Sequence, residues 1–124
     1  MENPDGNAPW PTALRLKSAE KVLEIDFDDG TSFALAAEFL RVESPSAEVR
    51  GHGPGQKQLV AGRRHVGIAN VEPVGNYAVR IVFDDLHDTG LYSWSYLHEL
   101  GRNRDRIWND YLRALEAAGL SRDP

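Results

Sequence analysis

The sequence predicts a small α+β domain: an antiparallel β-sheet built from hairpins, with helices mainly at the C-terminal end. Apolar and polar residues alternate through much of the chain before residue 84, with the period of two that a half-buried strand shows. Two tight-turn sequences, Asp28-Asp29-Gly30 and Gly75-Asn76, lie between alternating segments and favour hairpins. Helical spacing of apolar residues follows only near the C-terminal end. The length of 124 residues suits one domain.

Alternation also sets the expected strands and the expected core. The strand ranges are 13–17, 22–27, 31–35, 68–74 and 77–83, with a short extension at 91–92. On the last full strand, alternate residues share a face that we expect in the core: Tyr77, Val79, Ile81 and Phe83. Ala36–Arg41 lacks alternation and is expected to form a single helical turn. Residues 1–12 are rich in proline and are expected to be a flexible arm, so the domain is expected to span 13–120.

Two helices are expected after the last strand. The first spans Trp94–Leu100, with Ser93 as its N-cap and Gly101 as its stop. The second spans Asn103–Ala118, with its first residue as the N-cap, and ends at Gly119. Its apolar residues recur at helical spacing, so one face is expected to pack against the sheet.

Composition narrows the class of protein. The net charge is −5, from 14 basic and 19 acidic residues, which disfavours nucleic acid or an anionic membrane as a partner. No apolar run approaches the length of a membrane span, and the N-terminus lacks the features of a signal peptide, so a cytoplasmic location is expected. The chain has no cysteine, which excludes disulfides, thiolate metal sites and a cysteine nucleophile.

Positive charge gathers in one glycine-rich segment, residues 50–67, which we expect to be a long loop. Its basic residues are Arg50, Lys57, Arg63 and Arg64. One interpretation is a solvated connector between the two hairpins. The other is a docking surface for a partner or an anion. Both remain open at this point.

The residues form no standard catalytic set, so neither an enzyme nor a cofactor is expected. The most informative polar residue is His87, within the turn Asp84–Gly90. We expect His87 to be structural, with its imidazole fixed by Asp88 and by the turn backbone. A second interpretation, in which His87 joins Asp84, Asp85 and Asp88 around a weakly held divalent ion, remains open.

Two blocks of the chain resemble a known family. The first, Ile25–Gln56, contains the acidic turn Asp28-Asp29-Gly30, and the second, Gly75–Gly101, contains the motif His87–Gly90. Over roughly residues 13–101 the chain resembles the gamma-butyrobetaine hydroxylase-like N-terminal domain, a family long catalogued as a domain of unknown function. The resemblance implies a small α+β module. In carnitine-pathway hydroxylases this module precedes an iron dioxygenase domain, and elsewhere it accompanies a P-loop ATPase of iron–sulfur cluster assembly. Free-standing bacterial copies have no established activity.

The resemblance also implies a metal position. In the hydroxylases this domain holds a structural zinc through three cysteines and one histidine, and these map to Ser44, Ser46, Val49 and His87. All three thiolates are missing here, and neither hydroxyls nor a valine replace thiolates around zinc. We therefore expect no metal in this chain.

Together these features lead to two functional hypotheses. The first is a non-catalytic accessory or adaptor domain that binds a protein partner, with a link to iron–sulfur or redox metabolism that rests on the resemblance alone. The alternative is a small-molecule or anion-binding module that uses the basic loop, residues 50–64. Neither hypothesis sets the oligomeric state.

Overall fold

Two antiparallel three-stranded sheets and three helices make up the computed structural model, which describes residues 9–46, 57–88 and 90–124. The strand orders are β1-β2-β3 and β4-β5-β6. The elements are β1 (Pro11–Lys17), β2 (Val22–Phe27), β3 (Ser32–Ala36), α1 (Ala37–Val42), β4 (Ile68–Val74), β5 (Ala78–Phe83), β6 (Leu91–Ser93), α3 (Trp94–Arg102) and α4 (Arg104–Ala118). The predicted α+β class, with hairpins first and helices at the C-terminal end, is confirmed.

The first sheet is a meander of two hairpins. β2 pairs with β1 on one side and with β3 on the other, with Ile25 opposite Phe33. The predicted turn before β3 is present, and Gly30 supplies its positive φ of 87°. β1 begins at Pro11, two residues before the expected start, and a register shift between Pro11 and Ala13 interrupts its pairing with β2.

The second sheet is built around β5. The β4–β5 hairpin turns at Gly75 as predicted, and β6 pairs with the other edge of β5, with Val79 opposite Tyr92. Val79 is buried, as are Ile81 and Phe83. The prediction was wrong for Tyr77, which is 50% exposed because it belongs to the turn before β5.

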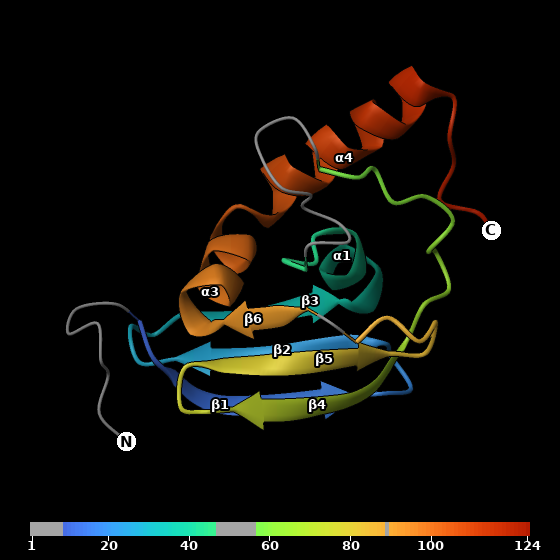
Figure 1. The fold of residues 1–124 in the computed structure, drawn as a ribbon. Coiled ribbons are helices and arrows are strands. Elements are labelled where there is room, and N and C mark those ends of the chain that lie inside the picture. The colour runs from blue at the N-terminus through green and yellow to red at the C-terminus, as the bar shows by residue number, and fades with distance from the viewer. Residues whose placement is uncertain (1–8, 47–56, 89) are drawn as a thin grey trace.

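One hydrophobic core joins both sheets to the helices. Leu23 and Ile25 of the first sheet share it with Ile81 of the second sheet and with Leu97 of α3, and all four are fully buried. Figure 1 shows the six strands in the lower part of the molecule and the three helices gathered above β3 and β6. Within the described ranges, no helix is both long enough and apolar enough to cross a membrane.

The start of α3 matches the prediction and its end does not. Ser93 is the N-cap, because its hydroxyl accepts from the Tyr96 N–H at 3.2 Å. The helix continues through Gly101 to Arg102. A Cβ at Gly101 would lie 2.4 Å from ring atoms of Phe33, so this glycine allows α3 to approach the first sheet closely and does not stop the helix.

The capping prediction for α4 is half right. Gly119 ends the helix in a left-handed conformation with φ of 68°, as expected. Asn103 does not cap α4 through its side chain. Its amide group donates to the Glu99 carbonyl at 3.1 Å and so satisfies the C-terminal end of α3.

The short helix α1 lies at the centre of the polar contacts. All of its six residues are buried, including Glu38 and Arg41. A helix buried on every side must pair its charged side chains within the protein. Glu38 pairs with Arg122, and Arg41 pairs with Asp85. The described part of the predicted loop, residues 57–67, has no regular secondary structure, and its Arg63 shares the Asp85 carboxylate with Arg41.

Candidate functional site

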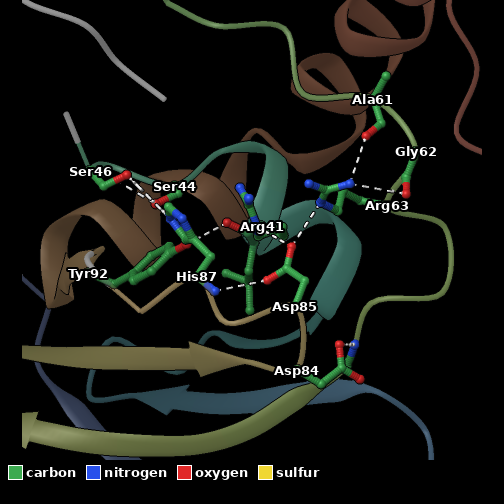
Figure 2. Close-up of polar contacts among 12 residues, drawn as sticks. Arg41, Ser44, Ser46, Ala61, Gly62, Arg63, Asp84, Asp85, His87 and Tyr92 are labelled. Atoms are coloured by element: carbon green, nitrogen blue, oxygen red, sulfur yellow. Dashed lines mark hydrogen bonds and ion pairs between the residues drawn. The ribbon is translucent and has the colours of Figure 1, made fainter. Parts of the chain in front are cut away.

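A cluster of two hydroxyls and one imidazole lies where α1 ends, beneath the turn that follows β5. His87 Nε2 is 2.9 Å from Ser44 Oγ and 3.3 Å from Ser46 Oγ, and the two hydroxyl oxygens are 3.3 Å apart (Figure 2). All three residues are buried, with exposed fractions of 0% for Ser44, 6% for Ser46 and 7% for His87. The fold thus gathers three of the four positions that the resemblance assigns to a metal. The fourth, Val49, lies outside the described residues.

The cluster is closed on the side of β6. A Cβ at Gly90 would lie 2.6 Å from Ser44 Oγ, so only glycine fits there. The hydroxyl of Tyr92 donates to the Leu40 carbonyl at 2.5 Å, and burial raises the pKa of this phenol well above its usual range. On this side the Ser44 hydroxyl, whose residue is fully buried, is enclosed by the body of the domain.

The chemistry of the cluster does not fit zinc. Zinc in proteins binds thiolates, imidazoles and carboxylates, whereas two of the three gathered groups are neutral hydroxyls. Within the described ranges, no group of three or more histidine, cysteine, aspartate or glutamate side chains gathers as a metal site. The Ser44 and Ser46 hydroxyls instead complete a hydrogen-bonded contact with the imidazole, which satisfies polar groups that would otherwise be buried alone.

Asp85 is the carboxylate that anchors the backbone of this turn, and the expected contact of Asp88 with the His87 imidazole stays a prediction. Asp85 Oδ1 accepts from the His87 backbone N–H at 3.1 Å, and Oδ2 accepts from Arg41 Nε at 2.8 Å. Arg63 Nε lies 2.8 Å from the same Oδ2 (Figure 2). Burial opposes the charge on Asp85, but the N–H of His87 and the Arg41 guanidinium hold its pKa below the usual range.

The other two acids of the turn point to other partners. Asp84 accepts from the Gly67 backbone N–H at 2.9 Å. Asp88 lies 3.8 Å from an Arg80 nitrogen and is 47% exposed. The side chains of Asp84, Asp85 and Asp88 therefore do not converge with His87 on a common point, as the divalent-ion interpretation requires.

Among the described residues, one positive charge in this region has no counter-charge of its own. Arg41 and Arg63 share the single carboxylate of Asp85. Arg41 is 8% exposed, and its Nη1 atom is buried with no hydrogen-bond partner among the described residues. A buried donor without a partner is uncommon and marks a place where a further acceptor would be stabilising.

The basic loop is tied to the body of the domain by ion pairs. Lys57 Nζ lies 2.6 Å from a Glu43 carboxylate oxygen, and Arg64 Nε lies 2.5 Å from an Asp123 carboxylate oxygen. Arg63 contacts Asp85 as described above. Three of the four predicted docking residues therefore contact acids of the same chain, while Arg50 lies outside the described residues.

A groove of about 400 Å³ adjoins the loop and was not predicted. It lies between the end of α1, residues 57–60 and one face of α4, with Val42, Ile107 and Tyr111 among its lining residues. The Tyr111 hydroxyl donates to the Val60 carbonyl at 2.6 Å, and burial raises the pKa of this phenol to about 12. The periodicity of α4 indicated an apolar face, but nothing in the sequence indicated that the loop would cover only part of it.

A second buried histidine joins α3 to the first hairpin. His98 Nε2 lies 2.8 Å from Asp29 Oδ2, and the imidazole packs edge-on against the rings of Phe27 and Phe33. The hydroxyl and backbone N–H of Thr31 lower the pKa of Asp29 to about 2, with a smaller contribution from His98. The sequence predicted the turn that contains Asp29 but carried no signal of its partner 69 positions away.

Comparisons with known proteins are consistent with this architecture. The model of the family described as gamma-butyrobetaine hydroxylase-like, N-terminal, matches residues 14–98. One NMR solution structure is 48% identical over 95% of this chain and 93% of that chain, with a TM-score of 0.84. Another is 50% identical over 100% of this chain and 92% of that chain, with a TM-score of 0.82.

A third solved structure carries a family description. It is the crystal structure of a protein of unknown function from the DUF971 family of Acidithiobacillus ferrooxidans, 40% identical over 73% of this chain and 91% of that chain, with a TM-score of 0.62. No curated protein matches the sequence. The match to the family model extends over more than half of the chain and includes β2 to β6 and the first residues of α3. The chain therefore belongs to the gamma-butyrobetaine hydroxylase-like N-terminal domain family.

Proposed function

We propose that this chain is a non-catalytic accessory domain of the cytoplasm that binds a protein partner. Its proposed link to iron–sulfur or redox metabolism rests on the settings in which related domains occur. What the structure contributes is a physical reason to favour binding over catalysis.

The observation that carries the proposal is the burial of the groups that acid–base chemistry would use. Among the described residues, hydroxyls meet imidazoles at His87 and at His98, and each histidine is 7% exposed. A general base must lie within reach of the proton that it removes from a substrate. Both imidazoles face hydroxyls or carboxylates of their own chain, so we assign them a role in the fold. The proposed function then depends on contacts between the surface of the domain and its partner.

Affinity purification from native extract, followed by mass spectrometry and by reciprocal purification through the recovered protein, tests this proposal. We expect one protein to be recovered in a fixed ratio to the chain from both directions. If no protein is recovered and the purified chain turns over a metabolite, the proposal is contradicted.

Binding of a small anion is the second candidate, and one observation favours it. Among the residues that the structure describes, Arg41 and Arg63 share one carboxylate, which leaves a positive charge without a counter-charge beside the unpartnered Nη1 of Arg41. Phosphate or a carboxylate metabolite would supply the missing acceptor.

Thermal unfolding at constant ionic strength, in chloride or in inorganic phosphate, tests anion binding. On this hypothesis phosphate raises the melting temperature of the wild type and of the Arg64→Gln variant, but not that of Arg63→Gln. Arg64 is the matched control because it is a neighbouring, similarly exposed arginine with a different partner. Equal melting temperatures in the two salts for all three proteins would exclude the anion site.

A further inference from the structure

Leu86 combines two unfavourable features in the turn between β5 and β6. Its side chain is 88% exposed, the most of the large apolar residues in the described part of the chain. Its φ is 73°, in the left-handed region that glycine and asparagine adopt readily and a bulky side chain does not. A single exposed leucine is ordinary, and so is a left-handed residue in a turn. Leu86 also belongs to neither of the apolar core clusters of this domain.

The buried network described above holds Leu86 in this conformation. The Leu86 N–H donates to the Phe83 carbonyl at 3.2 Å, and the Phe83 N–H donates to the His87 carbonyl at 3.0 Å. On the far side of Leu86, His87 is fixed through its backbone by Asp85 and through its ring by Ser44. Asp85 is itself held by two arginines. Both neighbours of Leu86 are therefore anchored, while its own side chain projects into solvent.

Such an arrangement suits a binding anchor. A side chain presented in one fixed conformation loses little freedom on association, so more of the free energy of its burial appears as affinity. Strained residues that the surrounding structure holds in place gather at binding and active sites. On the basis of the proposed protein-binding function, we propose that Leu86 is the anchor of a docking surface that inserts into an apolar pocket of a protein partner.

The charges around the turn indicate the chemistry of that partner. The nearby cations Arg63 and Arg80 contact the acids Asp85 and Asp88. The remaining acid of the turn, Asp84, accepts a backbone N–H. The exposed charges beside Leu86 are paired or hydrogen-bonded within the chain, and Arg41, which shares the Asp85 carboxylate with Arg63, is buried beneath the turn. The exposed surface of the turn therefore offers no strong field of either sign. The complementary surface is therefore an uncharged pocket that accepts one branched aliphatic side chain, and an anionic lipid surface is disfavoured.

The first experiment uses the purified chain alone. Leu86→Asn replaces the exposed side chain by one that tolerates positive φ, so we expect a higher melting temperature than that of the wild type. The matched control is Leu14→Asn, because Leu14 is also exposed but lies in β1. The control is not expected to raise the melting temperature. A lower melting temperature for Leu86→Asn would show that the leucine serves the fold of its own domain and would overturn the proposal.

The second experiment locates the contact. A photoreactive amino acid is placed at position 86 or at position 120, where the native leucine is 46% exposed on a different part of the surface. Cross-linking in native extract is expected from position 86 to the protein that the wild-type chain retains, and not from position 120. Leu86→Asn is expected to weaken binding of that purified protein about tenfold or more. Affinity is expected to change less than about twofold between low and high salt, because the contact is apolar.

The outcomes separate this inference from the proposed function. If the partner is retained equally by the wild type and by Leu86→Asn, only the assignment of Leu86 is wrong. If no variant retains a protein, both the proposed function and the inference are wrong. If the wild type, but not Leu86→Asn, binds vesicles of neutral and anionic phospholipid, the assignment of a protein pocket is wrong and Leu86 inserts into a membrane surface.

Discussion

His87 Nε2 lies 2.9 Å from the hydroxyl oxygen of Ser44, although 43 residues separate the two positions along the chain. This contact joins the end of α1 to the turn between β5 and β6. It occupies the position that the family resemblance assigns to a metal, and it is made without any thiolate. The polar network around it links these two segments by hydrogen bonds.

Removal of the imidazole tests the structural role of His87. His87→Ala leaves the buried hydroxyls of Ser44 and Ser46 without this partner, so we expect the free energy of unfolding to fall by about 1–3 kcal/mol. Urea denaturation measures the change. His65→Ala is the control, because His65 is exposed, and it is expected to change stability by less than about 0.5 kcal/mol. Equal stabilities of the two variants would contradict the structural role.

The pairing of Asp29 with Thr31 and His98 predicts a dependence of stability on pH. The folded-state pKa of Asp29 is about 2, below its ordinary value of 3.8, so this carboxylate stabilises the fold above about pH 4. As the pH falls from about 4 to about 2, Asp29 takes up a proton and this stabilisation is lost. We expect the free energy of unfolding of Asp29→Asn to fall less than that of the wild type over this pH range.

A second variant tests which group lowers the pKa of Asp29. Thr31→Val removes the hydroxyl that donates to Asp29 at 2.6 Å, so the pKa of Asp29 is expected to rise towards its ordinary value. Titration of the Asp29 carboxyl by NMR measures the shift in both proteins. An unchanged pKa in Thr31→Val would mean that another group supplies the stabilisation.

Gly101→Ala separates close packing from helix propensity. Alanine at an exposed helical site usually stabilises by about 0.5–1 kcal/mol. Here the added Cβ would lie 2.4 Å from the Phe33 ring, so we expect a net destabilisation of about 1–3 kcal/mol. The double variant with Phe33→Leu is expected to show a favourable coupling, because the smaller side chain makes room. A stabilising effect of Gly101→Ala alone would contradict the packing role.

The contact between Arg122 and Glu38 predicts that residues near the C-terminal end support α1. The Arg122 guanidinium donates to both Glu38 carboxylate oxygens, at 2.8 Å and 2.6 Å, and lies over the Trp108 ring. Arg122→Ala leaves the buried Glu38 without its partner, and we expect a loss of about 2 kcal/mol, which allows for the partial exposure of Arg122. Arg113→Ala, at an exposed pair with Asp110, is the control and is expected to change stability by less than about 0.5 kcal/mol.

Local signals predicted the elements well and their partners poorly. The hairpin at Gly30, the N-cap at Ser93 and the helix end at Gly119 each depend on residues within a few positions, and all three are confirmed. Gly101 was misread because a glycine that ends a helix and one that permits close packing look alike until the neighbouring Phe33 is placed.

The candidate site shows the same limit. The resemblance brought Ser44, Ser46 and His87 together, whereas sequence reasoning from the turn alone did not predict that Asp85 accepts from the His87 backbone N–H. The place of Asp85 depends on Arg41 and Arg63, which lie more than 20 positions away along the chain. Leu86 gave no signal, since neither its φ nor its exposure is encoded in a local pattern.

Amide hydrogen exchange at Leu86 and His87, with and without EDTA, tests most directly whether hydrogen bonds and not a metal hold this turn. The backbone N–H groups of both residues are hydrogen-bonded, so both amides are expected to exchange slowly in the wild type, at the same rate after chelation. In Ser44→Ala the loss of about 1 kcal/mol from the network is expected to speed exchange about fivefold. Loss of protection on addition of EDTA, with release of one equivalent of zinc, would contradict the account, as would unchanged protection in Ser44→Ala.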